Sequence, residues 1–448
     1  MHGESVNGYF DVEEIEVLVD YFLFYVGSDE ALEALDVGLC QHPNHPELLQ
    51  KRVKVLIERG DLNEAESCLE HFIEHDSYDT CILKTEILAK FNRIEEAKEM
   101  ALHILRHHDS SEAAYLDISD IFRDCDQHST ALYFIEQREK VAPLSVDMLF
   151  EKAYFLEQEG DYEQAIQTYQ DIISIDSYIG EAWFNLGQVY YTLQRYDEAI
   201  HAYTMCVTIN EDDPLAWIQK GHAHFLNKDA DSALTCYTKC MNFYSEKWEL
   251  YIFIAECLVL KKEYDKAIGF YQDSLNERSN NYKALIGLAV CHIETGNYIE
   301  AQRNLFTATN ISPESYEAWF YLGEIENFQH HTQAAIEYFK KSYMLNDTDI
   351  VIGMALGHIY ANMKDYDSAI PYYQKALEYA DEFQRVDILV FLATCYYYIG
   401  QHDMTLYYAE KAIKQNADAL SFFYTMCPEA VDTLSDIIEE NNHKTTKQ

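Results

Sequence analysis

The cysteines of this chain carry the side chains best suited to metal binding, but their spacing favours packing. Cys236 and Cys240 lie four residues apart on one predicted helix, where two thiols could share an ion. Cys240, however, stands 34 residues after Cys206, and Cys257 stands 34 residues before Cys291. A free cysteine behaves as a small buried hydrophobe, and such a role explains why the position recurs. We interpret these cysteines as core residues.

The histidines form three close pairs that could bind a metal or sense pH. The pairs are His107 with His108, His222 with His224, and His330 with His331. Neighbouring residues of a helix diverge by about 100°, so two adjacent imidazoles cannot easily hold one ion. We therefore expect no metal site at these pairs.

The common sequence signatures of catalysis are absent. No GxxxxGK[ST] or GxGxxG phosphate loop occurs, and no HExxH, CxxC or GxSxG. The acidic run Asn210–Asp213 lacks the spaced oxygens and the glycine of a calcium-binding loop. We predict a protein that is not an enzyme and that needs no metal and no cofactor.

Composition excludes further classes. The 448 residues contain 33 Lys and Arg against 77 Asp and Glu, a formal charge of −44, and this opposes binding to nucleic acid. The most apolar stretch, Ile388–Ile399, is shorter than the roughly 18 residues that a spanning helix needs. The start of the chain has no secretory signal, and the 11 cysteines are scattered, as in reduced proteins. We expect a cytoplasmic protein without membrane contact.

Alanines recur at a constant interval and reveal the elements that must position any site. The alanine series consists of Ala31, Ala65, Ala97, Ala131, Ala165, Ala199, Ala233, Ala267, Ala301, Ala335 and Ala369, and nine of its ten steps are 34 residues. Around it other positions recur, most completely as Trp183-x2-Leu186-Gly187-x2-Tyr190 followed by Ala199-x3-Tyr203. Two helices approach closely only where side chains are small, so this pattern predicts helix pairs.

The pattern resembles the tetratricopeptide repeat, a pair of antiparallel helices in about 34 residues. The resemblance covers residues 12–418. It implies an all-α fold, a right-handed superhelix of about twelve helix-turn-helix repeats with a C-terminal capping helix. Gly60, Gly160 and Gly296 stand where a first helix must end, and Asp161 and Asn297 follow as predicted N-caps.

The repeats differ in regularity, which predicts a division of the chain. We expect an N-terminal extension at 1–11, four degenerate repeats at 12–145, eight regular repeats at 146–418, and a cap and tail at 419–448. Large residues such as Ile104 and Arg138 stand in the earlier repeats where Cys206 and Cys240 stand later. The apolar segments 420–426 and 430–438 would cover the open end of the last repeat.

In the family that this chain resembles, the first helices line a concave groove that receives a peptide. Projected onto this sequence, the inner positions mix carboxylates with aromatic rings. The expected partner-binding residues are Asp147, Phe150, Glu151, Tyr154, Glu181, Phe184, Asn185, Gln188, Gln219, His222, Glu249, Phe253, Glu256, Phe320, Tyr321 and Glu324. A partner segment with Lys or Arg beside apolar anchors would fit such a groove.

Two other interpretations apply to these acidic positions. A carboxylate near the start of a first helix, as at Glu181, Glu249 and Glu317, also stabilises the helix dipole by about 0.3–1 kcal/mol. A clamp for C-terminal carboxylates, known in part of the family, is disfavoured, because Asn185 has Glu151, Glu181 and Gln219 as neighbours instead of Lys and Arg.

We therefore predict a non-catalytic scaffold or adaptor that binds a basic, partly apolar protein segment. The alternative is a regulatory or targeting subunit of a separate enzyme, such as a glycosyltransferase or a protease. A homodimer formed by end stacking is a further alternative, because Tyr9–Phe10 and Val17–Val26 make an apolar first helix.

Overall fold

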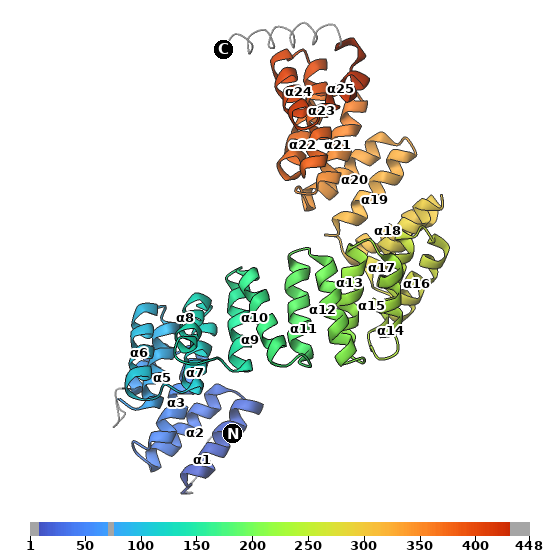
Figure 1. Ribbon diagram of the computed structural model, residues 1–448. Helices are drawn as coiled ribbons and strands as arrows, with labels where there is room; N and C mark the ends of the chain where they lie inside the picture. The colour runs from blue at the N-terminus through green and yellow to red at the C-terminus, as the bar shows by residue number, and fades with distance from the viewer. Residues whose placement is uncertain (1–8, 70–75, 431–448) are drawn as a thin grey trace, which may run out of the picture. The chain divides into compact units, whose positions relative to one another are not determined.

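The fold is built from helix pairs in two units. The structure, a computed structural model, describes residues 9–69 and 76–430, and within these ranges it contains 25 α-helices and no strand. Twelve antiparallel pairs and one closing helix follow one another, as the all-α prediction required (Figure 1). The chain divides into a first unit, Met1–Ala216, and a second unit, Trp217–Gln448.

The first unit holds the earlier pairs. Its helices are α1 (Val12–Tyr25), α2 (Ser28–Gln41), α3 (Pro46–Arg59), α4 (Leu62–Leu69), α5 (Tyr78–Lys90), α6 (Ile94–His107), α7 (Glu112–Arg123), α8 (His128–Glu139), α9 (Val146–Gln158), α10 (Tyr162–Ile175), α11 (Gly180–Thr192) and α12 (Tyr196–Ile209). The next helix, α13 (Pro214–Leu226), begins in this unit and continues in the second.

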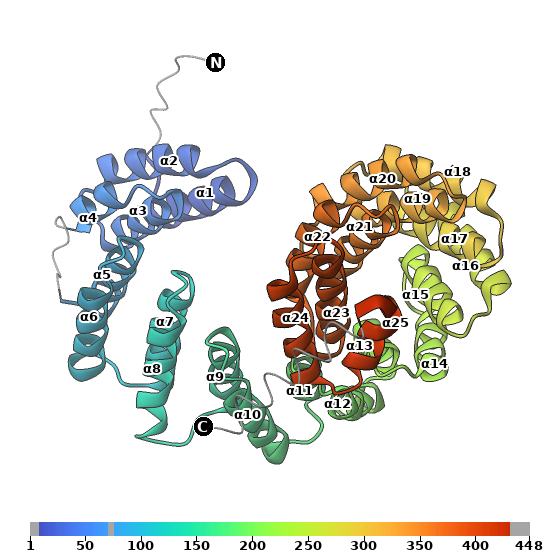
Figure 2. The same cartoon turned by 90° about the horizontal axis from the view of Figure 1, so that it is seen from above.

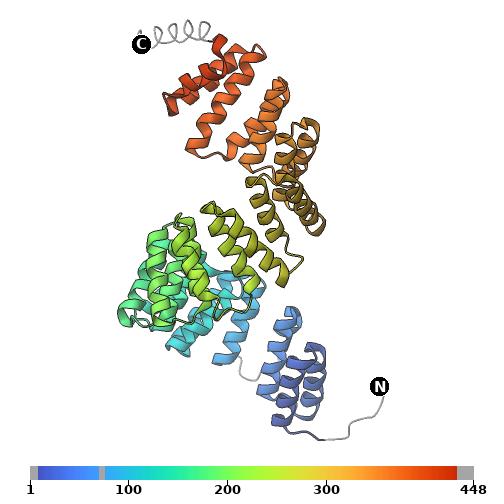
Figure 3. The ribbon, with the colours of Figure 1, turned by 90° about the vertical axis from the view of Figure 1, so that its right-hand side faces the viewer.

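The second unit holds the later pairs and the closing helix. Its helices are α14 (Ala230–Cys240), α15 (Lys247–Leu260), α16 (Tyr264–Glu277), α17 (Tyr282–Glu294), α18 (Tyr298–Ile311), α19 (Tyr316–Phe328), α20 (Thr332–Leu345), α21 (Ile350–Asn362), α22 (Tyr366–Tyr379), α23 (Glu382–Tyr398), α24 (His402–Gln415) and α25 (Ala419–Met426). Figure 3 shows the stacked pairs from another side.

The alanine series lies at the contact between the helices of each pair. Every alanine of the series is 0% exposed. In the facing first helices, glycines admit large rings from the second helix: a Cβ added to Gly187 would lie 2.6 Å from the ring of Tyr203, and one added to Gly323 would lie 2.6 Å from Phe339. The recurring small residues are therefore required by packing, as the sequence predicted.

The turns within the pairs use a left-handed residue. Gly60, Gly160 and Gly296 have φ between 77° and 87°, a conformation that favours glycine because it lacks a Cβ. Asp161 caps α10, since its carboxylate accepts a hydrogen bond from the backbone N–H of Gln164. Asn297 is the N-cap residue of α18, as predicted, but its side chain makes no capping hydrogen bond.

First and second helices lie on different sides of the second unit. In Figure 2 the pairs from α15 to α24 follow a curve, with odd-numbered helices inside and even-numbered helices outside. The inner side chains of this unit therefore come from α15, α17, α19, α21 and α23.

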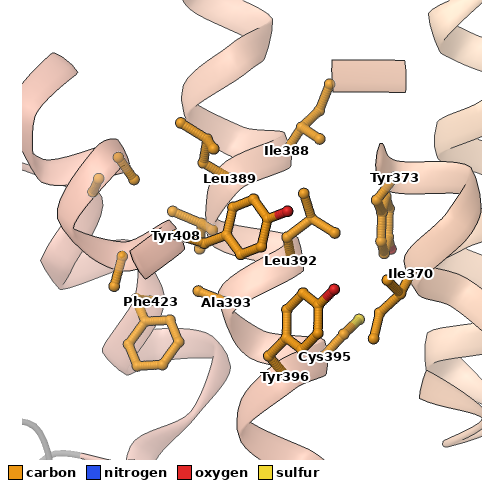
Figure 4. Close-up of a cluster of buried hydrophobic side chains, with 14 of the residues drawn as sticks. Ile370, Tyr373, Ile388, Leu389, Leu392, Ala393, Cys395, Tyr396, Tyr408 and Phe423 are labelled. Carbon is orange, nitrogen blue, oxygen red and sulfur yellow. The ribbon is translucent and has the colours of Figure 1, made fainter. Parts of the chain in front are cut away.

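The end of the second unit has its own apolar core. Leu392 and Cys395 of α23 pack with Tyr373 and Tyr408 of the flanking helices (Figure 4). Helix α25 covers this core with Phe423, which is 1% exposed, and packs against α23 and α24. The predicted segment 430–438 lies outside the described residues except for Ala430, which ends a 3₁₀ turn (Pro428–Ala430).

Candidate functional site: the inner faces of the first helices

The expected partner-binding residues fall into two groups, one in each unit. The first unit holds Asp147, Phe150, Glu151 and Tyr154 on α9 and Glu181, Phe184, Asn185 and Gln188 on α11. The second unit holds Gln219 and His222 on α13, Glu249, Phe253 and Glu256 on α15, and Phe320, Tyr321 and Glu324 on α19. We describe each face by itself.

A hollow of about 380 Å³ opens beside α11 in the first unit. Phe184, Ile209 and Leu215 contribute apolar walls, while Glu181 and Asp213 contribute carboxylates. Asp213 is engaged as a cap, because it accepts hydrogen bonds from the backbone N–H groups of Leu215 and of Ala216 at 3.0 and 3.2 Å. Glu181 is exposed, so its charge is available to a cation entering the hollow.

The carboxylate of Glu151 is already compensated. The guanidinium of Arg123 donates to Glu151 at 2.8 Å and also pairs with Asp120 at 2.7 Å. On the same helix, Phe150 packs against Tyr169 with ring centroids 6.2 Å apart. Tyr154 remains 39% exposed. On α9, therefore, Tyr154 is more available to a partner than Glu151 is.

Gln188 and His222 each hold a buried tyrosine of their own helix pair. The phenol of Tyr203 donates to the Gln188 carbonyl oxygen. His222 Nδ1 lies 2.7 Å from the Tyr237 hydroxyl, and His358 Nδ1 lies at the same distance from Tyr373. These residues occupy equivalent places in their repeats, so one role in packing explains them all.

Two aromatic rings, those of Tyr237 and Phe253, contact His222. The imidazole meets the ring of Phe253 at 4.6 Å between centroids and at an interplanar angle of 86°. Burial lowers the pKa of His222 to about 4. The ring is consequently neutral at pH 7, so His222 brings no positive charge to the inner face.

A cluster of carboxylates lies around Tyr321 in the second unit. Burial raises the pKa of Tyr321, and the negative charges of Glu317, Glu324 and Glu294 raise it further. Glu294, at the end of α17, was missed by the sequence analysis because its position carries no repeating acidic pattern. Its carboxylate accepts a hydrogen bond from Tyr264 at 3.2 Å.

Two carboxylates of this face are partly desolvated. Glu256 and Glu324 reach water, yet the surrounding protein raises the pKa of both by burial. Lys283 acts in the opposite direction on Glu256. Among the described residues, neither carboxylate forms an ion pair within 4.0 Å. This face can therefore attract a cation and place it beside aromatic rings.

Among the described residues, the cysteine and histidine pairs that are close in the sequence do not form metal sites with each other. Cys236 and Cys240 are buried, as expected for core residues. His331 pairs with Glu326 at 2.8 Å and His224 with Asp229 at 3.3 Å. One group of possible ligands does converge, at Asp76, Cys81, His103 and His108, where the ligand atoms lie within 4.8 Å of one another.

The described chain is thus an α-solenoid whose first helices present acidic and aromatic side chains. Family models of the tetratricopeptide repeat match it at residues 146–178 and 215–246, at 180–213 and 354–383, and at 258–324. The chain is a tetratricopeptide repeat protein, and in general terms it is a protein-interaction scaffold of a generally non-catalytic family.

Several solved structures have similar folds. A tetratricopeptide repeat protein from Parabacteroides merdae ATCC 43184 is 16% identical over 56% of this chain and 99% of its own, with a TM-score of 0.47. A chain of the Cut9–Hcn1 heterotetramer of APC/C is 15% identical. The match covers 84% of this chain and 82% of that chain, with a TM-score of 0.43. YrrB, described as a TPR protein with an unusual peptide-binding site, is 15% identical. The match covers 42% of this chain and 96% of YrrB, with a TM-score of 0.33.

No protein of curated function matches the chain. Within the described residues, no helix combines the length and the apolar character that crossing a membrane would require.

Proposed function

We propose that the inner faces of the first helices bind a protein segment that carries Lys or Arg beside apolar side chains. The observation that carries this proposal is a pair of carboxylates on first helices, Glu256 of α15 and Glu324 of α19, the latter near Tyr321. Both are partly desolvated and have no ion-pair partner among the described residues. A cationic side chain that approached either one would offset the cost of keeping it charged.

The rings beside the carboxylates supply the apolar contacts. Phe320 packs on Phe339 with ring centroids 5.6 Å apart. The ring centroids of Phe320 and Tyr321 are 5.5 Å apart. In the first unit, the hollow of about 380 Å³ beside Phe184 has room for one large apolar side chain. Charge would raise the rate of encounter, and burial of aromatic surface would provide most of the affinity.

A binding assay with paired variants tests this proposal. The probe is a labelled synthetic peptide that alternates Lys with Leu and Phe, with a counterpart that has Glu in place of Lys. Glu256→Gln with Glu324→Gln should weaken binding of the basic peptide by roughly tenfold, because two unpaired charges are removed. Fluorescence anisotropy on the full chain provides the affinity.

The matched control removes the same charge from second helices. Asp273 of α16 and Glu337 of α20 are exposed, so Asp273→Asn with Glu337→Gln should leave binding close to wild type. Equal losses in both double variants, or equal affinity for the basic and acidic peptides, would refute the proposed site.

The subunit interpretation predicts a different result from the same protein. A regulatory or targeting subunit of a glycosyltransferase or protease would co-purify with that one enzyme in constant stoichiometry. A scaffold for basic segments would instead retain several proteins that share this chemistry.

The homodimer is supported by an apolar surface on α1. Val17, Tyr21, Phe24 and Tyr25 are between 53% and 79% exposed. Such a face would be covered by end-to-end stacking of two chains. Sedimentation velocity over a concentration series would detect the dimer.

A further inference from the structure

Four side chains with metal-binding atoms meet at the open end of the α5–α6 pair. They are Asp76, Cys81, His103 and His108. The Asp76 carboxylate lies 2.9 Å from His108 Nε2 and 3.7 Å from His103 Nε2. Cys81 Sγ lies 3.5 Å from the same carboxylate and 3.9 Å from His108 Nε2. All four ligand atoms lie within 4.8 Å of one another.

These separations suit one small tetrahedral ion. Zinc binds sulfur at about 2.3 Å and nitrogen or oxygen at about 2.0–2.2 Å, so neighbouring ligands of a tetrahedral site are about 3.3–3.8 Å apart. The observed separations require the side chains to shift by about 1 Å at most. One thiolate, two imidazoles and one carboxylate form a donor set that selects zinc over magnesium or calcium, which prefer oxygen ligands alone.

The helix pair brings the ligands together from both of its chain segments. Ser77 caps α5, so Asp76 stands just before this helix and Cys81 lies in its first turn. His103 lies just before the last turn of α6, and His108 is its C-cap residue. The negative end of the α6 dipole favours a cation at this place.

Burial differs across the cluster in a way that suits an ion entering from water. Cys81 is 2% exposed, whereas the Asp76 side chain is 69% exposed. The sulfur therefore forms the floor of the site and the carboxylate forms its entrance. Nδ1 of His103 is buried without a hydrogen-bond partner among the described residues, and such orphaned atoms gather at functional sites.

We propose that this chain binds one Zn²⁺ through Asp76, Cys81, His103 and His108. The four protein ligands fill a tetrahedral shell, so the ion is structural and leaves no position for a reacting molecule. It ties the start of α5 to the end of α6. This cross-link between the two helices lies in a degenerate repeat, where Ile104 replaces the small residue found in later repeats.

Metal titration of the full chain tests the site. After removal of metal by chelator, Zn²⁺ is added in competition with a chromophoric chelator, and Co²⁺ is used separately as a spectroscopic probe. The wild type should bind one Zn²⁺ per chain. Its Co²⁺ form should show the visible bands of tetrahedral cobalt and an ultraviolet thiolate-to-cobalt band.

Variants of individual ligands separate coordination from folding. Cys81→Ser should abolish the thiolate band and weaken Zn²⁺ binding by more than about a hundredfold, because a direct ligand is lost. Asp76→Asn should also weaken binding, and its exposed position leaves the core intact, so a folding defect is not expected there. Zn²⁺ should raise the melting temperature of the wild type and of neither variant.

Matched controls change the same residue types elsewhere. Cys125→Ser and His292→Asn lie outside the cluster and should bind one Zn²⁺ with wild-type affinity. The proposal is overturned if the wild type binds no Zn²⁺, if Asp76→Asn and Cys81→Ser bind it as tightly as the wild type, or if bound Co²⁺ shows no thiolate band.

Discussion

At the scale of single residues, the inner row of the first helices combines exposed and packed side chains. Gln188, His222 and His358 hold buried tyrosines, whereas Glu256 and Glu324 occupy the same row without ion-pair partners among the described residues. Each of the five holds the same position in the first helix of its own repeat. A buried aromatic ring of the second helix stands 15 residues after each of them, so the presence of such a ring does not by itself decide whether a hydrogen bond forms.

The buried imidazole of His222 should make the fold sensitive to mild acid. Its pKa is about 4 in the folded chain against 6.5 in the unfolded chain, so only the unfolded state takes up the proton between these values. The stability that neutral His222 provides is complete above pH 6.5 and is lost as the pH falls towards 4. The loss should not exceed about 3 kcal/mol.

The matched substitution for this test occurs elsewhere in the chain. His222→Gln should retain the acceptor for Tyr237, as Gln188 does for Tyr203, but should not titrate. Urea unfolding of both proteins at a series of pH values measures the difference. If the variant and the wild type lose equal stability between pH 6.5 and pH 4, the interpretation of His222 is wrong.

At the scale of helices, the close approach within four of the pairs depends on glycine in the first helix. Tyr237 of α14 fills the space that a Cβ at Gly221 of α13 would occupy, with its ring 2.5 Å from that position. The rings of Tyr203, Phe339 and Tyr373 face Gly187, Gly323 and Gly357 in the same way. In each of these pairs, a large ring of the second helix faces a glycine of the first helix.

Gly221→Ala should destabilise the fold by about 1–3 kcal/mol, because the added methyl group overpacks this contact. Gly269 lies within α16, where an added Cβ meets nothing within 4 Å. Gly269→Ala should consequently stabilise the fold by about 0.5–1 kcal/mol through helix propensity. Chemical denaturation of the two variants measures both effects, and destabilisation of similar size in both would contradict the packing model.

At the scale of the whole molecule, the formal charge of −44 governs how partners approach. Raising NaCl from about 0.01 M to about 0.15 M shortens the Debye length from about 30 Å to about 8 Å. Affinity for the basic peptide should therefore fall several-fold over this range. A control peptide with Gln in place of Lys should respond little, and an equal response of the two peptides would remove support for electrostatic attraction.

The architecture was predictable because the repeat encodes it locally. Each alanine of the series, from Ala31 to Ala369, is 0% exposed, and the glycines opposite the tyrosines carry the same information. Close packing of neighbouring helices requires small residues at the same position once per pair. This requirement therefore appears in the sequence as a regular spacing of small residues.

The pairing of side chains was decided only by the tertiary structure. Glu151 is neutralised by Arg123, 28 residues earlier, while Glu324 is left without an ion pair among the described residues. Asp76 and Cys81 meet His103 and His108 because α5 and α6 fold back on each other. Such contacts join positions that are not equivalent between repeats, so no period marks them. They depend on side-chain directions and distances that exist only after the helices have packed.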